Sequence, residues 1–263
     1  MLEGGFELRS WCTNEPNLAK TLELEGTATS HEKQFEKVLG YDYVPASDNL
    51  RLSEVQLNPK ANTKRAILSE ISKIFDPLGM FQPMTVRGRL LIRGLWVEKY
   101  DWDQPITHDS SKQWENLSND LASLSSYEFK RNAIPANDNM LTVFCDASKV
   151  MYGFAAYAVS EDASNLIFSK SKVSPIKPRS LPTLELLSVF LALKCLDSIL
   201  SSYEADAFSS VVMAVDAQIV LSWILSGEVK TKKIFTRNRV SDIKSMISEL
   251  QSKHGITIEF RYV

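Results

Sequence analysis

Three carboxylates occupy positions in this sequence where a charged side chain is expensive. Asp146 and Asp216 each close a short, mostly apolar run, and Glu185 lies within the apolar segment 184–193. A carboxylate in such a place is unfavourable unless something compensates its charge. A divalent cation held by all three would do so. The three residues are therefore candidate metal ligands.

Each carboxylate also has an ordinary structural explanation. An Asp at the end of a strand is commonly a turn residue or a helix N-cap, and Asp216 could cap a helix that follows it. Glu185, in the first turn of a helix, could simply complement the helix dipole. Their order along the chain favours a shared site: a strand ending in Asp, a three-strand meander, a helix carrying Glu, and a second strand ending in Asp.

The elements that must position these residues lie beyond residue 140. Hydrophobic patterning predicts strands over 141–146, 153–159, 166–172, 210–216 and 256–263, and helices over 182–200, 217–225 and 240–253. This alternation predicts an α/β domain with a mixed five-stranded sheet and helical cover. Open sheets of this kind place their ligands at the carboxyl ends of strands, where Asp146 and Asp216 would lie.

The first half of the chain reads differently. Residues 1–62 are mixed and polar, with a short strand or hairpin over 35–43. Three helices are predicted next. The first begins at the N-cap Thr63 and is stopped by Pro77, and the others span 85–99 and 110–124. The polar, proline-containing segment 131–140 is the predicted domain boundary.

Composition narrows the possible functions. Thirty basic and 32 acidic residues give a net charge of −2, which excludes a bulk polycation but not a local basic patch. Three scattered cysteines exclude a disulfide framework and a cysteine zinc module. The sequence has no apolar run long enough for a membrane span and no signal-peptide pattern at its start, so we expect a soluble, intracellular protein.

Two groups of basic residues are candidates for nucleic-acid contact. The first is an acid-free run within ten residues, made of Lys230, Lys232, Lys233, Arg237 and Arg239. The second is made of Lys170, Lys172, Lys177 and Arg179. A solvated loop would explain either group equally well. Tyr152, Tyr157 and Trp223 are expected in the core rather than as base-stacking residues.

The second half of the chain resembles a ribonuclease H domain of the retroelement type over residues 136–263. Residues 145–148 (CDAS) and 152–157 (YGFAAY) resemble the first hairpin with its metal-binding Asp. Residues 181–187 (LPTLELL) resemble the helix with the metal-binding Glu, and 215–224 (VDAQIVLSWI) the strand–Asp–helix element.

The likeness extends to the Pol polyproteins of BEL/Pao LTR retrotransposons. Residues 64–79, which end in the FDPLG element, are similar to this family, as are 170–175 and 235–240. In that alignment, 4–11 and 37–40 fall in the reverse transcriptase, downstream of its polymerase active site. The resemblance implies three parts: a reverse-transcriptase remnant (palm and primer grip) over 1–62, a helical thumb- or connection-like region over 63–135, and a ribonuclease H-like domain over 136–263.

The resemblance also implies a mechanism. Asp146, Glu185 and Asp216 would be catalytic and would bind two Mg²⁺ or Mn²⁺ ions, and the RNA strand of an RNA–DNA hybrid would be hydrolysed. Oxygen-only ligands suit these cations better than zinc. The implied partners are the hybrid and the remainder of the Pol polyprotein. The implied location is a cytoplasmic retroelement particle, with the nucleus as an alternative.

The sequence departs from the family pattern in two respects. The Tyr-x-Asp-Asp motif of a polymerase is absent, and we interpret Asp101 and Asp103 as turn and cap residues rather than as a substitute. Ribonucleases H usually carry a fourth acidic residue on a helix after the last strand, whereas this sequence stops at Val263 within that strand. We therefore expect a polyprotein fragment, a decayed copy or an incomplete gene product.

Two other functions compete with the nuclease. The first is an inactive or co-opted nucleic-acid or protein interaction module of the same ancestry, which the missing fourth acid favours. The second is an aspartic peptidase, because this region has been catalogued under a Pao peptidase name. A retroviral-type peptidase needs Asp-Thr-Gly or Asp-Ser-Gly, and the residues 146–148 (DAS) are neither.

Overall fold

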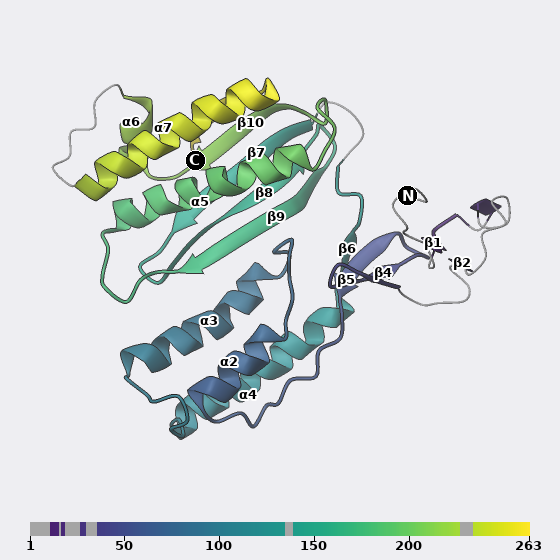
Figure 1. Ribbon diagram of the computed structural model, residues 1–263, viewed down its shortest axis with the longest axis vertical. Helices are drawn as coiled ribbons and strands as arrows, with labels where there is room; N and C mark the ends of the chain where they lie inside the picture. Colours follow the sequence, from purple (N-terminus) through teal and green to yellow (C-terminus); the bar gives the residue numbers. More distant parts are fainter. Residues whose placement is uncertain (1–10, 16, 19–26, 30–35, 135–138, 227–233) are drawn as a thin grey trace, which may run out of the picture.

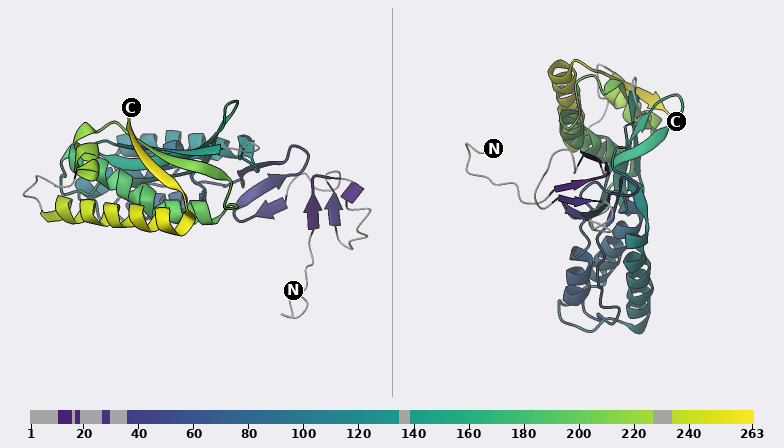
Figure 2. Two further views of the ribbon diagram at one scale, coloured as in Figure 1. Left: turned by 90° about the horizontal axis from the view of Figure 1, so that it is seen from above. Right: turned by 90° about the vertical axis from the view of Figure 1, so that its right-hand side faces the viewer.

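The computed structural model describes residues 11–15, 17–18, 27–29, 36–134, 139–226 and 234–263. Two regions make up most of it: a large sheet with helices on one face, and a bundle of helices with a small sheet beside it (Figure 1). Two short parallel strands, β1 (Trp11–Thr13) and β2 (Thr27–Thr29), lie at the far end of the small sheet (Figure 2).

The five-stranded sheet is mixed, as the sequence predicts. Its strands are β7 (Asn139–Ala147), β8 (Met151–Val159), β9 (Ser164–Val173), β10 (Phe208–Val215) and β11 (Thr257–Tyr262). The spatial order is β11-β10-β7-β8-β9. β7, β8 and β9 form an antiparallel meander, whereas β10 runs parallel to both β7 and β11. Strands β7 and β10 lie next to each other inside the sheet and are mostly buried, which explains their apolar sequences.

Three helices accompany this sheet: α5 (Leu181–Ser201), α6 (Gln218–Leu225) and α7 (Ile234–His254). Helices α5 and α7 run side by side over one face (Figure 1). Helix α5 is apolar around most of its circumference because it is enclosed between the sheet and α7. Its Leu186, Val189 and Leu193 are buried together with Leu141 of β7 and Ile243 of α7.

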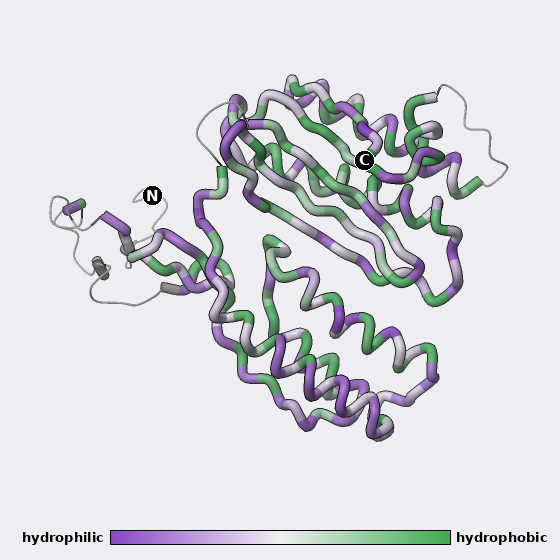
Figure 3. The backbone as a smooth tube through the Cα atoms, turned by 180° about the vertical axis from the view of Figure 1, so that it is seen from behind, coloured by the Kyte–Doolittle hydropathy of each residue, from purple (hydrophilic) through white to green (hydrophobic). Residues whose placement is uncertain are grey.

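The second region combines a four-stranded antiparallel sheet with three helices. The strands are β3 (Glu36–Val38), β4 (Tyr41–Val44), β5 (Asn49–Leu52) and β6 (Glu128–Lys130). The helices are α2 (Lys64–Ser72), α3 (Gln82–Val97) and α4 (His108–Ala122), and a 3₁₀ turn over Ser123–Ser126 follows α4. Hydrophobic and hydrophilic residues alternate along these helices (Figure 3), which gives each an inner face.

The second core joins residues from both sides of position 62. Tyr41 and Leu52 of the small sheet are buried with Ile67, Leu95 and Trp114 of the helices. The hairpin predicted over 35–43 is present as β3 and β4. Strands β5 and β6 were not predicted, because each is short and they pair across 79 residues of sequence. The assignment of 1–62 and 63–135 to parts of a reverse transcriptase stays a prediction.

Several predicted element ends are wrong by a few residues. Thr63 caps α2 as predicted, and its side chain accepts from the amide of Ala66, but the helix ends at Ser72, before Pro77 can stop it. Helix α3 begins at Gln82 because Pro83 suits a first helical turn. Helix α7 begins at Ile234 rather than at 240. The prediction missed its first turn because residues 236–239 are polar and show no hydrophobic periodicity.

The predicted linker 131–140 is only partly a linker. Arg131 forms an ion pair with Asp48 of the small sheet, with 2.8 Å between Nε and Oδ1. Ala133 and Ile134 pack against the core of the five-stranded region, and β7 already begins at Asn139. Residues 135–138 lie outside the described residues.

The two regions meet where α3 lies along the edge strand β9. The amide of Ser169 donates to the carbonyl of Leu78 at 2.9 Å, and Arg89 Nη1 donates to the carbonyl of Ser171 at 2.8 Å. Gly79 has a φ of +73°, and a Cβ there would lie 1.9 Å from the carbonyl oxygen of Ser169. The FDPLG element thus carries its glycine where the chain turns against β9, at a point that no other residue fits.

Candidate metal centre

The pairing of β7 with β10 brings two of the predicted carboxylates together. These strands are parallel, and Cys145 lies opposite Val215. The residues that follow, Asp146 and Asp216, therefore stand next to each other at the carboxyl ends of adjacent strands. Asp216 does not cap the helix after it, because the N-cap of α6 is Ala217 and has no side-chain hydrogen bond.

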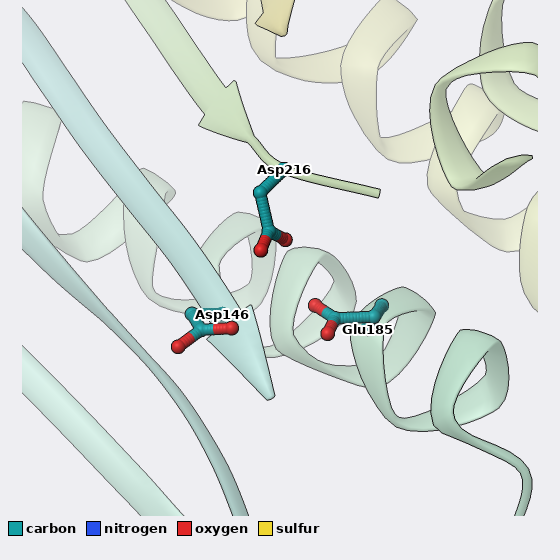
Figure 4. Close-up of side chains that lie close together, drawn as sticks. All are labelled: Asp146, Glu185 and Asp216. Carbon is teal, nitrogen blue, oxygen red and sulfur yellow. The ribbon is translucent and has the colours of Figure 1, made fainter. Parts of the chain in front are cut away.

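Helix α5 supplies the third carboxylate. The helix begins at Leu181, so Glu185 lies beyond the first turn, and no acidic residue lies in that turn. The alternative that Glu185 complements the helix dipole is therefore wrong, since that effect fades within the first turn. Glu185 instead points from α5 toward Asp146 and Asp216 (Figure 4).

The three carboxylates form one cluster. Each of Asp146, Glu185 and Asp216 offers an oxygen, and these oxygens all lie within 4.8 Å of one another. The two aspartates are exposed, whereas Glu185 is buried. No other group of three or more His, Cys, Asp or Glu within the described residues has this geometry.

The electrostatics of the cluster are unfavourable without a counter-charge. Burial, followed by the charges of Asp216 and Asp146, raises the pKa of Glu185 to about 7. Burial and the nearby Glu185 and Asp146 also raise the pKa of the Cys145 thiol. This thiol faces the core, so it is a packing residue rather than a nucleophile.

A divalent cation fits this donor set. Oε2 of Glu185 is buried and has no hydrogen-bond partner, which is costly for a carboxylate. Carboxylate oxygens alone are the ligands of hard cations. A cation between the three side chains would occupy Oε2 and remove the mutual repulsion. The cluster is therefore of a kind that holds a divalent cation.

The predicted nucleic-acid residues are only partly described. Lys230, Lys232 and Lys233 lie outside the described residues. Arg237 is exposed on α7. Arg239 is half-buried, with its guanidinium 3.8 Å from the ring centre of Phe190 on α5.

Of the second basic group, Lys170 and Lys172 are exposed on β9, and Lys177 and Arg179 are exposed before α5. Sequence reasoning missed Phe190, Phe235 and Lys194, whose rings and charge join these basic residues. Helical periodicity predicts packing roles for both phenylalanines. Their rings also contact the guanidinium groups of Arg179 and Arg239, which is seen only once α7 lies against α5.

A cavity that the sequence did not predict opens beside Asp146. It measures about 560 Å³ and lies between the start of α3 and the sheet face opposite α5. Val86 and Pro83 line it from α3, and Phe144 and Met151 from the sheet. Tyr152 also lines this cavity. Tyr152 and Trp223 are half-buried and pack against the core, as predicted. Tyr157 is half-buried too, but its ring packs edge-on against Phe144 on the cavity side of the sheet.

Strand order, mixed pairing and three converging carboxylates define a ribonuclease H-like domain. The sequence matches the family described as Pao retrotransposon-like RNaseH-like domain over residues 63–217. The chain belongs to this family. The match begins at the N-cap of α2, so the family spans the junction between α3 and β9 as well as the acidic cluster.

One solved structure shares the fold at low sequence identity, and a second is similar to about half of the chain. A foamy viral protease-reverse transcriptase in complex with an RNA/DNA hybrid has a TM-score of 0.52 and 14% identity, over 87% of this chain and 29% of that chain. The chain thus spans less than a third of that relative's length. LC11-RNase H1 in complex with an RNA/DNA hybrid has a TM-score of 0.34 and 12% identity, over 48% of this chain and 85% of that chain.

Two further comparisons add little. A search of curated proteins finds no match. Within the described part of the chain, no helix is both long and apolar enough to cross a membrane. The peptidase alternative gains no support from the family match, which describes an RNaseH-like domain.

Proposed function

We propose that this chain hydrolyses the RNA strand of RNA–DNA hybrids, using Mg²⁺ or Mn²⁺ held by Asp146, Glu185 and Asp216. The observation that carries this proposal is the convergence of the three carboxylate oxygens within 4.8 Å at the end of the ribonuclease H-like sheet. Divalent cations in such a site, two in the family's mechanism, supply polarisation of the phosphate and activation of water. No protein nucleophile is needed.

The three side chains have distinct tasks. Asp146 and Asp216 are exposed, so they would be the ligands nearest the scissile phosphate. Glu185 closes the site from within and must lose its proton to act as a ligand. Because its pKa is raised to about 7, cation binding competes with a proton at this residue.

The substrate class follows from two supports. The foamy viral relative, whose fold this chain shares, was solved with an RNA/DNA hybrid. Arg237 and Arg239 offer phosphate contacts on the same domain, and the sequence adds Lys230, Lys232 and Lys233. Contacts to 2′-hydroxyls across the shallow minor groove would select the RNA strand.

The polyprotein context is part of the same proposal. The fold likeness to the foamy viral protein covers 87% of the chain, which is more than the five-stranded region comprises. This supports the assignment of the region from β3 to β6 to a thumb- or connection-like part of a reverse transcriptase. The remainder of a Pol polyprotein is then the partner of this chain.

Cleavage of a labelled RNA–DNA hybrid tests the proposal. The chain, its Asp146→Asn variant and a matched Asp162→Asn control are compared with Mg²⁺, Mn²⁺ and EDTA. Asp162 is exposed in the turn between β8 and β9, so its variant changes the same charge away from the cluster. We expect metal-dependent cutting of the RNA strand by the chain and the control only. Folded protein that leaves the hybrid intact with both metals contradicts the nuclease and favours an interaction module.

Calorimetric titration with Mn²⁺ tests metal binding independently of hybrid cleavage. We expect heat of binding from the chain and from Asp162→Asn, and a strong loss for Glu185→Gln. A chain that binds Mn²⁺ but cuts nothing keeps the metal centre and loses the nuclease.

A further inference from the structure

Cations and aromatic rings alternate across the face formed by α5 and α7. The guanidinium of Arg179 lies 4.5 Å from the ring centre of Phe235, and that of Arg239 lies 5.5 Å from the same ring. Arg239 also lies 3.8 Å from the ring centre of Phe190, and Lys194 Nζ lies 4.9 Å from it. These five residues form one continuous set of contacts, which together with Lys170 and Lys172 we name the basic row.

The lysines of β9 extend the row across the sheet edge. Lys170 and Lys172 are exposed on the same side of β9. Burial raises the pKa of the Cys195 thiol on α5, and the charges of Lys170, Lys172 and Lys194 act against this rise, so the three ammonium groups lie near this thiol. Lys170 and Lys194 line a common cavity of about 410 Å³ beside that thiol.

The row starts close to the level of Glu185 along the axis of α5. Phe190 lies five residues after Glu185 on α5, which is about 7.5 Å along the helix axis. Burial raises the pKa of the Tyr152 hydroxyl, and the charge of Arg239 acts against this rise. Tyr152 also lines the cavity next to Asp146. Lys194 is nine residues from Glu185, or about 13 Å along the same axis. The row therefore extends along the axis of α5 over several nucleotide lengths, on a different face of the helix from Glu185.

Most of its charge is not used within the protein. Among the described residues, neither Arg179 nor the lysines Lys170, Lys172 and Lys194 have a carboxylate within salt-bridge distance. Arg239 pairs with Asp242 at 3.1 Å, but its buried Nε has no hydrogen-bond partner. Unpaired cations gathered on one face are the electrostatic footprint of a polyanion.

The rings indicate how that polyanion is bound. Bases stack on free aromatic faces in single-strand binding proteins. Here Phe190 and Phe235 are already covered by cations, so they hold guanidinium and ammonium groups in place rather than offering a stacking surface. Ordered cations of this kind suit phosphate contacts that do not depend on base sequence.

We propose that the basic row binds the sugar–phosphate backbone of the RNA–DNA hybrid beyond the cleaved phosphate. This inference rests on the proposed function for the identity of the polyanion. The row would give the domain a second contact with its substrate, along α5 and the β9 edge. Binding there would hold longer hybrids in place without adding sequence preference.

Salt-dependent binding tests the row without relying on cleavage. Binding of a fluorescent 24-base-pair hybrid is measured in EDTA with the full chain carrying Asp146→Asn. The row variant is Lys170→Gln, Lys172→Gln and Lys194→Gln. The matched control is Lys60→Gln, Lys112→Gln and Lys130→Gln, which removes three exposed charges from the other region.

Each lost phosphate contact should lower the slope of log K against log salt by about 0.9. We expect the row variant to lose a slope of about 2 to 3 and the control to keep its slope. Equal slopes for row variant and control overturn the inference. If the parent chain fails to cleave the hybrid with metal but the row variant still has the lower slope, the basic row stands and only the nuclease is contradicted.

A second variant keeps every charge. Phe190→Leu removes the ring that orders Arg239 and Lys194, and Leu retains a side chain that can pack on α7. We expect binding weakened about two- to fivefold, the size of an exposed cation–π contact. Unchanged binding, with circular dichroism showing a folded chain, would contradict the role given to the rings.

Discussion

Asp76 in the helical region is a half-buried carboxylate, and Glu185 in the ribonuclease H-like region is a buried one. Only Asp76 has hydrogen bonds from the chain to both of its oxygens. Oδ1 of Asp76 accepts from the hydroxyl of Tyr41 at 2.8 Å and from the amide of Met80, and Oδ2 accepts from the amide of Phe81. Oε2 of Glu185 is buried without a partner.

The comparison separates structural from functional charge. The same helical region also holds the buried ammonium of Lys64, which donates to the carbonyl of Tyr100 and lies 3.7 Å from the ring centre of Trp96. The polar atoms of these charged groups are given their partners by the fold itself. The acidic cluster instead has negative charge that nothing in the described part of the chain compensates. A cation could compensate it, and without the cation this charge lowers the stability of the fold.

The largest expected effect concerns the junction between the two regions. Gly79→Ala forces a side chain into a left-handed backbone and against the carbonyl of Ser169. We expect a loss of about 4 kcal/mol in the free energy of unfolding, measured by urea titration. Gly94→Ala is the matched control, because Gly94 lies in α3 and a Cβ added there would have no atom within 4 Å. This variant should raise the free energy of unfolding slightly. Equal effects of the two variants would show that the junction is not tight.

Asp76→Ala sharpens the comparison from the structural side. It leaves the Tyr41 hydroxyl and two amides without their acceptor, so we expect a loss of about 3 kcal/mol. Urea titration with tyrosine absorbance follows the change. The FDPLG loop should also become sensitive to protease, and a variant as stable as the parent would remove the structural role of Asp76.

Glu185→Gln should act in the opposite direction. The folded-state pKa of Glu185, about 7, lies above that of an unfolded Glu. Between these two values the native chain binds more protons, so metal-free stability falls as pH rises, until Glu185 is ionised in both states. The penalty reaches about 3 kcal/mol above pH 7, and Gln removes it.

Thermal unfolding in EDTA at pH 5 and pH 8 measures this difference. We expect Glu185→Gln to gain stability over the parent at pH 8 and to gain little at pH 5. Added Mn²⁺ should stabilise the parent at pH 8 and leave the variant unchanged. A variant that is less stable than the parent at pH 8 would place Glu185 with Asp76 as a structural carboxylate.

The smallest effect is expected at Lys64. Lys64→Met keeps most of the side-chain volume but removes the cation between Trp96 and Trp102 and leaves the carbonyl of Tyr100 without its donor. A loss of about 2 kcal/mol is expected. Tryptophan fluorescence during urea unfolding reports on it, and a stable variant with unchanged emission would show that this charge is not structural.

The ribonuclease H-like region was predictable because its signals are local. Apolar runs that end in Asp mark buried parallel strands, and a long apolar helix with one Glu marks a helix enclosed by a sheet. The order of these elements then fixed the sheet and its three carboxylates. The helical region was predicted less well, since β5 and β6 are short strands and β6 pairs with β5 only through a long-range contact.

Residue type and order alone therefore determined the strands, the main helices, the family and the identity of the acidic cluster. The tertiary structure alone decided that Asp146, Glu185 and Asp216 converge, because convergence depends on the register of β7 with β10 and on where α5 crosses them. It also decided that the rings of Phe190 and Phe235 contact cations. Such contacts join residues distant in sequence, and no local pattern encodes the distance between them.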